Sequence, residues 1–334
     1  MKKKLTALLL AATMTLTLTA CGTTSSTSSA SPAASSSAAA SSDKTYTVGI
    51  CQLVQHPALD AATKGFKQAL TDKLGDKVKF DEQNASGDTA TCATICNQFV
   101  SSNVDLIMAN ATTALQAAQT ATSTIPVLGT SVTDYGTALG IQNWTGKTGT
   151  NVSGTSDLAP LDKQADMVKE LFPDAKKVGI LYCSAEPNSK YQSTVITGYL
   201  EKLGYTCKEY TFSDSNDLQS VATSCANDSD VVYVPTDNTV ASNAAIIKNV
   251  CVPLKKPVVA GEEGICSGCG VATLSISYYD LGYTTGEMAA KILTGEADIS
   301  EMPIEYTDVT KKYNKTICED LGLTVPEGYE AIEG

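Results

Sequence analysis

The stretch Val178-Gly179-Ile180-Leu181 decides the fold, because it restarts a pattern that begins at Val48-Gly49-Ile50-Cys51. Both stretches are short apolar runs, which is typical of buried strands. Later apolar runs correspond in the same way, namely 104–108 with 230–234 and 125–129 with 256–260. Each correspondence has an offset of about 130 residues. The chain therefore contains two copies of one structural unit.

Helical patterns separate these apolar runs. After the first run, apolar residues recur at helical spacing from Leu59 through Phe66 to Leu74. Further helices are expected around Ile95 and Phe99 and at 113–122, 189–203, 216–226, 239–250 and 280–293, and further strands at 78–80 and 206–212. Strands that alternate with helices form parallel sheets covered on both faces. The expected fold is therefore α/β, with two similar Rossmann-like lobes.

The first 45 residues differ in composition from the rest of the chain. Lys2, Lys3 and Lys4 precede the apolar run 5–18, which is shorter than the roughly 20 residues of a membrane span, so 1–20 is interpreted as a signal peptide. Its end, Leu18-Thr19-Ala20-Cys21, resembles the lipobox of bacterial lipoproteins, which implies lipidation of Cys21. The alternative is an ordinary secretion signal. Residues 21–45, rich in Ser, Ala and Thr, are expected to form a disordered linker.

The charge of the chain excludes several functions. Its 24 basic residues are all Lys, they are outnumbered by 36 acidic residues, and the formal net charge is -12. Nucleic-acid affinity comes from clustered Lys and Arg, so no nucleic-acid partner is expected. The single His excludes a metal site built from several His, and no metal or cofactor is expected.

The loops that follow the expected strands indicate a polar ligand. In open parallel sheets, ligands bind beyond the carboxyl ends of the strands, and two facing lobes would form a cleft there. These loops are rich in Asn, Asp, Ser, Thr and Glu, and they lie at 52–57, 84–88, 109–113, 130–135, 184–188, 213–216, 235–238 and 262–264. Helix N-caps favour the same residue types, so each of these side chains is either a cap or a ligand contact.

Over residues 46–310 the chain resembles a known family, the lipid-anchored substrate-binding proteins of bacterial ABC importers, specifically the tryptophan/tyrosine-binding type. The order and spacing of several segments carry this resemblance: His56–Asp60, Asn84-Ala85, Gly87-Asp88, Ile125–Val127, Val132–Asp134, Asn151–Gly154, Tyr182 with Glu186, Asn188-Ser189, Pro235–Ser242 and Tyr278–Gly282. Two features depart from the family pattern. Tyr135 stands where the family usually has Pro, and the cysteines are unusually many.

The resemblance implies a periplasmic-binding-protein type I fold, with three crossover strands forming a hinge. The N-lobe would comprise 46–157 with about 276–305, and the C-lobe 158–275 with about 306–334. It also implies an extracytoplasmic lipoprotein, expected to be a monomer, that delivers a small ligand to an ABC permease and its ATPase. An aromatic amino acid is the favoured ligand, and a nucleoside, a sugar or a small peptide is the alternative.

The same resemblance assigns roles within the cleft. Asp237, helped by Asn238, would bind the ligand ammonium. Because the chain lacks Arg, the carboxylate would be held at the start of a helix by Thr112 and Thr113. Orienting hydrogen bonds would come from Asn84, Asp134, Glu186 and Asn188. Tyr135, Trp144 and Phe212 are candidates for apolar contact, with a structural plug in a loop as the equal alternative for Trp144. His56 either lines the cleft or has a cap or hinge role.

No enzymatic activity is expected. The chain lacks the phosphate loop GxxxxGK[ST], a complete dinucleotide fingerprint and the GxSxG nucleophile motif. One rival is a cysteine hydrolase that uses His56, but no local signature pairs it with a thiol. A second rival is a sensory ligand-binding module, which would share the same fold.

Ten cysteines remain besides Cys21. Cys92 and Cys96 are four residues apart on an expected helix, so they share a face. Cys266 and Cys269 form a CxxC pair without a nearby His, which is a weak metal motif. Free or structural thiols, one or two disulfides, and a metal site stay open as interpretations.

Overall fold

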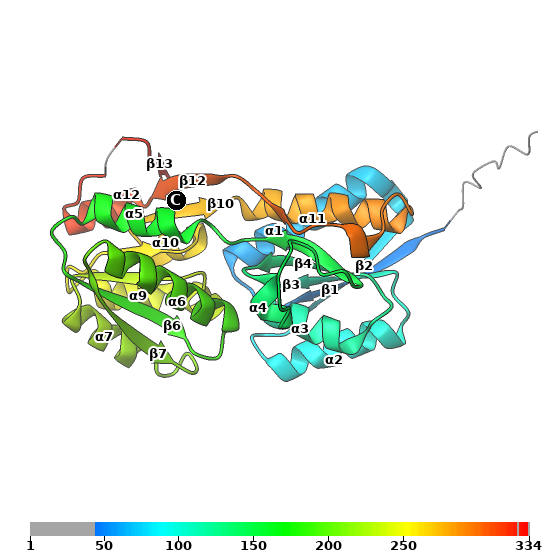
Figure 1. Ribbon diagram of the computed structural model, residues 1–334, viewed down its shortest axis with the longest axis horizontal. Coiled ribbons are helices and arrows are strands. Elements are labelled where there is room, and N and C mark those ends of the chain that lie inside the picture. The colour runs from blue at the N-terminus through cyan, green and yellow to red at the C-terminus, as the bar shows by residue number, and fades with distance from the viewer. Residues whose placement is uncertain (1–43, 326, 333–334) are drawn as a thin grey trace, which may run out of the picture. The chain divides into compact units, whose positions relative to one another are not determined.

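The computed structural model describes residues 44–325 and 327–332, and two sheets with alternating helices dominate it (Figure 1). The predicted α/β class with two parallel-sheet lobes is confirmed. The predicted signal peptide, Cys21 and all but the last two residues of the expected linker lie outside the described residues. Within the described part, no helix combines the length and apolar character needed to cross a bilayer.

The N-lobe has a six-stranded sheet in the order β11-β5-β4-β3-β1-β2, with every neighbouring pair parallel. Its strands are β1 (Tyr46–Gln52), β2 (Val78–Asn84), β3 (Leu106–Asn110), β4 (Val127–Val132), β5 (Val152–Ser156) and β11 (Glu305–Tyr306). One face packs on α2 (Thr89–Ser101), α3 (Thr112–Ala121) and α4 (Tyr135–Leu139). The other packs on α1 (Pro57–Leu74) and α11 (Tyr278–Leu293). Short 3-10 turns lie at η1 (Gly75–Lys77) and η2 (Ile299–Glu301).

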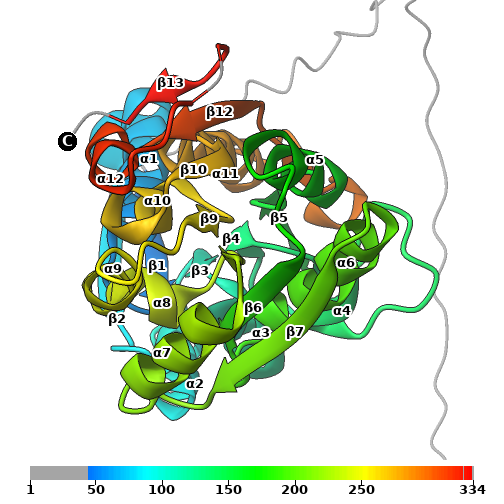
Figure 2. The ribbon, with the colours of Figure 1, turned by 90° about the vertical axis from the view of Figure 1, so that its left-hand side faces the viewer.

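The C-lobe has a seven-stranded sheet in the order β13-β12-β10-β9-β8-β6-β7. Its strands are β6 (Lys177–Cys183), β7 (Thr206–Phe212), β8 (Val231–Val234), β9 (Val258–Ala260), β10 (Ala272–Ile276), β12 (Val309–Tyr313) and β13 (Glu330–Ala331). Helices α5 (Leu161–Leu171) and α6 (Pro187–Lys202) share one face, while α7 (Leu218–Asp228), α9 (Ala244–Cys251) and α10 (Glu263–Cys269) cover the other (Figure 2). The remaining helices are α8 (Asn238–Ser242) and α12 (Lys315–Leu321).

One strand pair corrects the expectation of a purely parallel sheet. β12 runs antiparallel to β10, with Ile276 opposite Val309 and Ala272 opposite Tyr313. The chain enters β12 directly from β11 of the other sheet, beside the end of β10. A strand that starts there can only run back along its neighbour, so the antiparallel pair follows from the short connection.

The repeat seen in the sequence is present in the strand order. β4-β3-β1-β2 in the N-lobe corresponds to β9-β8-β6-β7 in the C-lobe. The matching glycines also share a role, because a Cβ on Gly49 would meet the Phe99 ring of α2 at 2.6 Å, and one on Gly179 would meet Cys225 Sγ of α7 at 2.4 Å. In both lobes a glycine on the second strand from the edge allows the helix that follows the edge strand to pack closely.

Element boundaries differ from the prediction in several places. The strand expected at 104–108 is β3 at 106–110, and the helix expected at 239–250 is divided at Asn243 into α8 and α9. Helices α4, α5, α10 and α12 were not expected. Three of these four are seven residues or shorter, and such short segments carry too few apolar repeats to show a helical period.

The chain passes between the two sheets three times, after β5, after β10 and after β11. These passages form the three-crossover hinge expected of the fold. The exact lobe limits of 46–157 with about 276–305, and 158–275 with about 306–334, stay a prediction.

Glycines allow α11 to lie directly on α1. A Cβ on Gly282 would stand 1.9 Å from the Ala62 carbonyl oxygen, and one on Gly65 would stand 2.0 Å from the Tyr279 carbonyl oxygen. Gly286 makes the same kind of approach to Phe66. The two backbones are therefore in contact, and this contact joins the segment after the second crossover to the first helix of the N-lobe.

Gly282→Ala should lower the free energy of unfolding by about 1–3 kcal/mol, because the added methyl group must separate two packed backbones. Urea denaturation followed by circular dichroism measures this change. The matched control is Gly198→Ala within α6, where a Cβ meets nothing within 4 Å. That variant should be as stable as the native protein or slightly more stable, because Ala favours helix. Equal effects of the two substitutions would contradict the close α1–α11 contact.

Candidate functional site

A cavity of about 280 Å³ lies between the two lobes at the carboxyl ends of the strands. We call it the interlobe cavity. The N-lobe contributes Leu53, Val54, Ser86, Gly87, Thr89 and Thr113, and the C-lobe contributes Cys183, Ala185, Glu186, Ser213, Asp214, Ser215, Asn238, Thr239, Ser242 and Asn243. Beside it, a tight seam joins the lobes through Thr112, Asp134, Thr137, Ala138, Pro187, Asn188 and Tyr191.

The eight predicted binding residues fall into three groups. Thr113, Glu186 and Asn238 line the interlobe cavity. Thr112, Asp134 and Asn188 line the seam. Asn84 and Asp237 line neither: Asn84 is exposed, with Oδ1 accepting the Ser86 backbone N–H, and Asp237 is buried. The strand-end rule thus brings six of the eight residues to the interface between the lobes.

Glu186 is the centre of a hydrogen-bond network at the start of α8. Its Oε1 accepts from the Thr239 backbone N–H and hydroxyl, both at 2.8 Å. Its Oε2 accepts from the Asn238 N–H at 3.0 Å, the Asn238 amide Nδ2 at 2.8 Å and the Asn188 Nδ2 at 3.1 Å. A carboxylate at a helix N-terminus is favoured by the unpaired N–H groups there. Glu186 therefore fixes the orientation of Asn188 and Asn238.

Asp237 has a different position from the one its predicted role requires. It is 1% exposed, and its Oδ2 accepts from the Cys183 N–H and the Ser189 hydroxyl, both at 2.8 Å. Its Oδ1 caps α8 by accepting from the Val240 N–H at 2.8 Å. Burial and the neighbouring Glu186 carboxylate raise the pKa of Asp237 above its usual range. These contacts make Asp237 a support for the loop, and they leave it poorly placed to bind an ammonium.

The side chains of His56 and Asn238 connect the two lobes directly, with His56 Nε2 3.2 Å from Asn238 Oδ1. Since Asn238 Nδ2 donates to Glu186, its Oδ1 is the acceptor toward His56, so His56 Nε2 carries the hydrogen. His56 Nδ1 is buried without a partner in the part of the chain that the structure describes. Burial lowers the pKa of His56 below its usual range, which favours the neutral ring.

Helix α3 provides hydrogen-bond donors on the N-lobe side of the interlobe cavity and the seam. Its N-cap is Ala111, which has φ 92° and no side chain able to cap the helix. Thr112 and Thr113 form the first turn and lie in the seam and the cavity, respectively. The first N–H groups of a helix lack intrahelical partners and attract anions. By contrast, Asp134 caps its own helix α4, with Oδ1 2.7 Å from the Thr137 nitrogen.

Sequence reasoning missed a group at the hinge. Asp157 follows β5, and its carboxylate accepts from the hydroxyls of Thr133 and Tyr278, both at 3.0 Å. Burial raises the pKa of Asp157 to about 6 and that of the nearby Glu262 to about 7. The position of Asp157 directly after a strand was the signal that could have identified it.

The predicted aromatic contacts lie elsewhere. Tyr135 is buried in the N-lobe, donates to the Thr155 carbonyl oxygen and stacks on Trp144 with the ring centroids 6.5 Å apart. Phe212 is buried in the C-lobe core. The aromatic side chain that does reach the interface is Tyr191 of α6, which lines the seam. The prediction missed it because it lies on helix α6, three residues past the loop 184–188 that was expected to line the cleft.

The ten cysteines between Cys51 and Cys318 are free thiols in the structure. Nine of them are buried, and only Cys207 is half-buried. Cys183 lines the interlobe cavity, whereas Cys51 lies with Cys92 and Cys96 in the N-lobe core. Their main contribution is therefore apolar packing.

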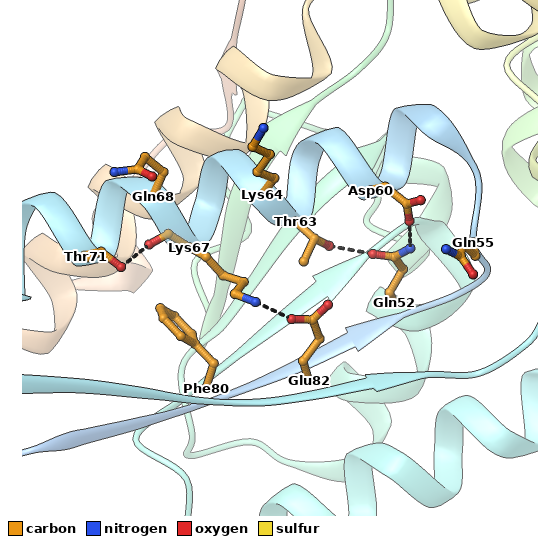
Figure 3. A pocket seen from close by; sticks show the side chains of 10 residues that line it. All are labelled: Gln52, Gln55, Asp60, Thr63, Lys64, Lys67, Gln68, Thr71, Phe80 and Glu82. Carbon is orange, nitrogen blue, oxygen red and sulfur yellow. Dashed lines mark hydrogen bonds and ion pairs between the residues drawn. The ribbon is translucent and has the colours of Figure 1, made fainter. Parts of the chain in front are cut away.

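A larger cavity, of about 470 Å³, belongs to the N-lobe alone and lies between α1 and β2 (Figure 3). Its polar side chains bind one another. Lys67 Nζ pairs with Glu82 at 2.6 Å, and Gln52 donates to Asp60 at 2.7 Å and accepts from Thr63 at 2.6 Å. This cavity does not join the lobes, whereas the interlobe cavity does.

The geometry agrees with comparisons with known proteins. The family model for ABC transporter substrate binding proteins matches residues 47–331. This chain belongs to that family. It is 42% identical over 273 residues to a tyrosine-binding protein of Clostridioides difficile, covering 81% of this chain and 79% of the relative. As a family member it is a substrate-binding protein.

Solved structures extend the comparison. A Streptococcus pneumonia ABC domain in complex with L-Trp is 33% identical, with a TM-score of 0.82 over 86% of this chain and all of that chain. A ligand-free, open substrate binding protein from Clostridium difficile is 39% identical, with a TM-score of 0.67 over 86% and 99%. A leucine binding protein from Thermotoga maritima, 14% identical with a TM-score of 0.59, shows the fold alone. The present structure is thus closer to the ligand complex than to the open form, in line with the contact between His56 and Asn238.

Asp237→Ala should lower the free energy of unfolding by about 1–3 kcal/mol, because it removes a helix cap and leaves buried N–H groups without acceptors. Guanidinium denaturation measures the change. Asp217→Ala is the matched control, since Asp217 is the exposed N-cap of α7 and makes no side-chain cap bond. The control should leave the denaturation midpoint nearly unchanged. Equal midpoints for the two variants would contradict the supporting role of Asp237.

Proposed function

We propose that this protein captures an aromatic amino acid, with tyrosine and tryptophan favoured, in the interlobe cavity and delivers it to an ABC permease. The observation that carries the proposal is the cavity itself, which lies between two lobes and has acidic groups on one side and the uncapped N-terminus of α3 on the other. The relatives named for tyrosine and crystallised with L-Trp support the choice of ligand.

The charge around the cavity favours a ligand with an ammonium group. Glu186 and Asp214 line it, Asp134 lines the seam, and no Lys is among the residues that line either. Glu186 is the buried one of these three carboxylates. A buried carboxylate without a cation is costly, so a ligand ammonium would be stabilised beside Glu186. The ligand carboxylate would bind the N–H groups of Thr112 and Thr113, and Tyr191 would contact the aromatic ring. These positions match the two ends of a zwitterion.

Function follows from closure of the lobes, without covalent chemistry. A ligand that contacts both lobes favours the closed state by the difference between its affinities for the closed and open states. Asn238 links the ligand cavity to this movement, because it lines the cavity and also accepts from His56 of the other lobe. The closed form would then be recognised by the permease, whose ATPase drives import.

Other ligands remain alternatives within the same fold. A nucleoside, a sugar or a small peptide would also fit between two lobes, and a sensory role would use the same closure. Sugars usually stack on aromatic faces, and no aromatic residue lines the interlobe cavity. That feature favours an amino acid over a sugar.

The sequence supports attachment to the membrane through lipid on Cys21, with the folded part outside the cell. The linker from residue 21 to residue 45 would then hold a monomer near the permease. A flexible linker of this size has a root-mean-square reach of about 25 Å. That distance is enough for the lobes to turn toward a partner in the same membrane.

Isothermal titration of the purified residues 44–334 against L-Tyr, L-Trp, L-Phe, L-Leu, adenosine and glucose tests the ligand. We expect binding of L-Tyr or L-Trp at least tenfold tighter than that of L-Leu, and no heat with adenosine or glucose. In a thermal-shift experiment, a ligand at 100 times its Kd should add about 2.7 kcal/mol of stability. Failure of folded protein to bind any of the three aromatic amino acids would remove this proposal.

The anchor is tested by fractionating cells that express the full chain and its Cys21→Ser variant. The native protein should sediment with membranes and partition into the detergent phase of Triton X-114. The variant, which lacks the thiol that receives lipid, should lose both properties. The control Cys207→Ser changes the half-buried thiol and should behave like the native protein. Membrane association of the Cys21→Ser variant equal to that of the native protein would rule out lipidation at this residue.

A further inference from the structure

We propose that the contact between His56 and Asn238 makes closure of the lobes depend on pH: it forms while the His56 ring is neutral and is lost when acidification protonates the ring. The inference rests on the proposed function, since the opening of the lobes would release the captured ligand. Histidine is the side chain whose ordinary pKa lies between about pH 5 and pH 8. The chain has one histidine, and it lies at the contact between the lobes.

The backbone around His56 fixes the direction of its ring. His56 is the N-cap of α1 and precedes Pro57, and the residue before a proline is held in an extended conformation. Its φ of -161° and ψ of 164° are extended, and its carbonyl oxygen accepts from the Asp60 N–H at 3.0 Å. The ring reaches the C-lobe, where Nε2 lies 3.2 Å from Asn238 Oδ1. The contact therefore joins the start of α1 to the start of α8.

Asn238 can present only an acceptor to His56. Its Nδ2 donates to Glu186 Oε2 at 2.8 Å, and turning the amide over would bring its oxygen against that carboxylate. The Nε2 atom of His56 must therefore carry a hydrogen, and in the neutral ring Nδ1 then carries none. Nδ1 is buried, and residues 44–325 and 327–332 supply no partner for it. The neutral ring thus fits the closed interface with one hydrogen bond.

A protonated His56 ring fits the closed interface poorly. Its Nδ1–H would be a buried donor for which the described residues supply no acceptor, and its charge would be withdrawn from water, since His56 is 6% exposed. Burial accordingly has the largest effect on the pKa of His56 and lowers it below its usual range. The Asn238 oxygen and the carboxylates of Glu186 and Asp60 act in the opposite direction without balancing burial.

The helices that contact α1 carry further titratable groups. On α10, Glu262 caps its own helix and Glu263 pairs with Lys312 at 2.6 Å. The titratable residues of α11 are Tyr278, Tyr279, Asp280, Tyr283, Glu287 and Lys291. The Tyr278 hydroxyl donates to Asp157 at 3.0 Å. Burial raises the pKa of Asp157 to about 6 and that of Glu262 to about 7, so both carboxylates titrate in the same pH range as a histidine.

Opening of the lobes would restore the ordinary behaviour of the ring. When the lobes separate, the contact is broken and the ring meets water, where a histidine has a pKa of about 6.5. The open state then binds a proton more readily than the closed state, so closure below that pH must release one. Ligand affinity should therefore fall by up to about tenfold for each pH unit below about 6.5, until the lower pKa of the closed state is reached.

Titration calorimetry of the native protein and His56→Gln at pH 7.5 and pH 5.5 tests this dependence, with L-Tyr or L-Trp, whichever binds more tightly. Both amino acids remain zwitterions at the two pH values. Gln keeps a side-chain N–H for Asn238 but cannot take up a proton. Asp157 and Glu262 are present in both proteins, so the difference between the proteins belongs to His56. The rise in Kd on acidification should be about 3- to 10-fold larger for the native protein.

Nuclear magnetic resonance observes the ring directly, because the protein without a histidine tag has one imidazole. Without ligand, the titration midpoint should lie near about pH 6.5, and a saturating amount of the amino acid should lower it by at least about one pH unit. Glu262→Gln is the matched control, since it removes a carboxylate that titrates in this range and keeps His56. The same shift of the His56 midpoint is expected in this variant.

Several results would overturn the inference. An equal rise in Kd for the native protein and His56→Gln, or a His56 midpoint that the amino acid leaves unchanged or raises, would remove it while the proposed function stood. Loss of the shift in Glu262→Gln would assign the pH dependence to the hinge carboxylate and would also remove it. If the native protein binds none of L-Tyr, L-Trp and L-Phe, the proposed function fails, and release of such a ligand fails with it. Circular dichroism at both pH values checks folding, and His56→Asn provides a second variant that cannot be protonated, for which the same loss of pH dependence is expected.

Discussion

The common direction of the strands is the constraint on which the rest of the structure depends. Because parallel strands end at one edge of a sheet, the loops after β1, β2, β3 and β4 meet on one side of the N-lobe. The corresponding loops of the C-lobe meet in the same way. The interlobe cavity, the seam and the direct contact of His56 with Asn238 all arise from these loops. Helix packing, including the close approach of α11 to α1, keeps the sheets fixed behind them.

The second constraint is the absence of arginine, which limits the groups that can stabilise a buried carboxylate. The chain stabilises the buried Glu186, Asp237 and Glu262 with backbone N–H groups and hydroxyl or amide side chains in place of cations. Such donors are fixed by the fold, so they orient the carboxylates, but they do not neutralise them. Burial accordingly raises the pKa of Glu262 to about 7 and that of Asp157 to about 6. The interface is therefore a negative region that a cationic group of a ligand can complete.

Much of the fold and of the candidate site could be predicted from the sequence, because both depend on hydrophobic periodicity and on the internal repeat. The match between Val48–Cys51 and Val178–Leu181 established two α/β lobes, and the strand-end rule located Glu186 and Asn238 at the cavity. The roles of the site residues were harder to predict than their positions in the fold. Asp237 follows a strand like Glu186, yet it turns inward to cap α8, and a sequence does not show which way a loop carboxylate points. Asp157 was missed because its partners Thr133 and Tyr278 are 24 and 121 residues away along the chain.

The hydrogen bond between His56 and Asn238 has a kinetic consequence. It joins side chains 182 residues apart on different lobes, so it exists only while the lobes are together. A contact of this kind forms after the ligand has entered, and it therefore has little influence on the association rate. Its free energy acts on the dissociation rate, because the lobes must break it before the ligand can leave. In the proposed capture of a ligand, His56 and Asn238 would thus lengthen the time for which the molecule is retained, separately from how selectively it is chosen.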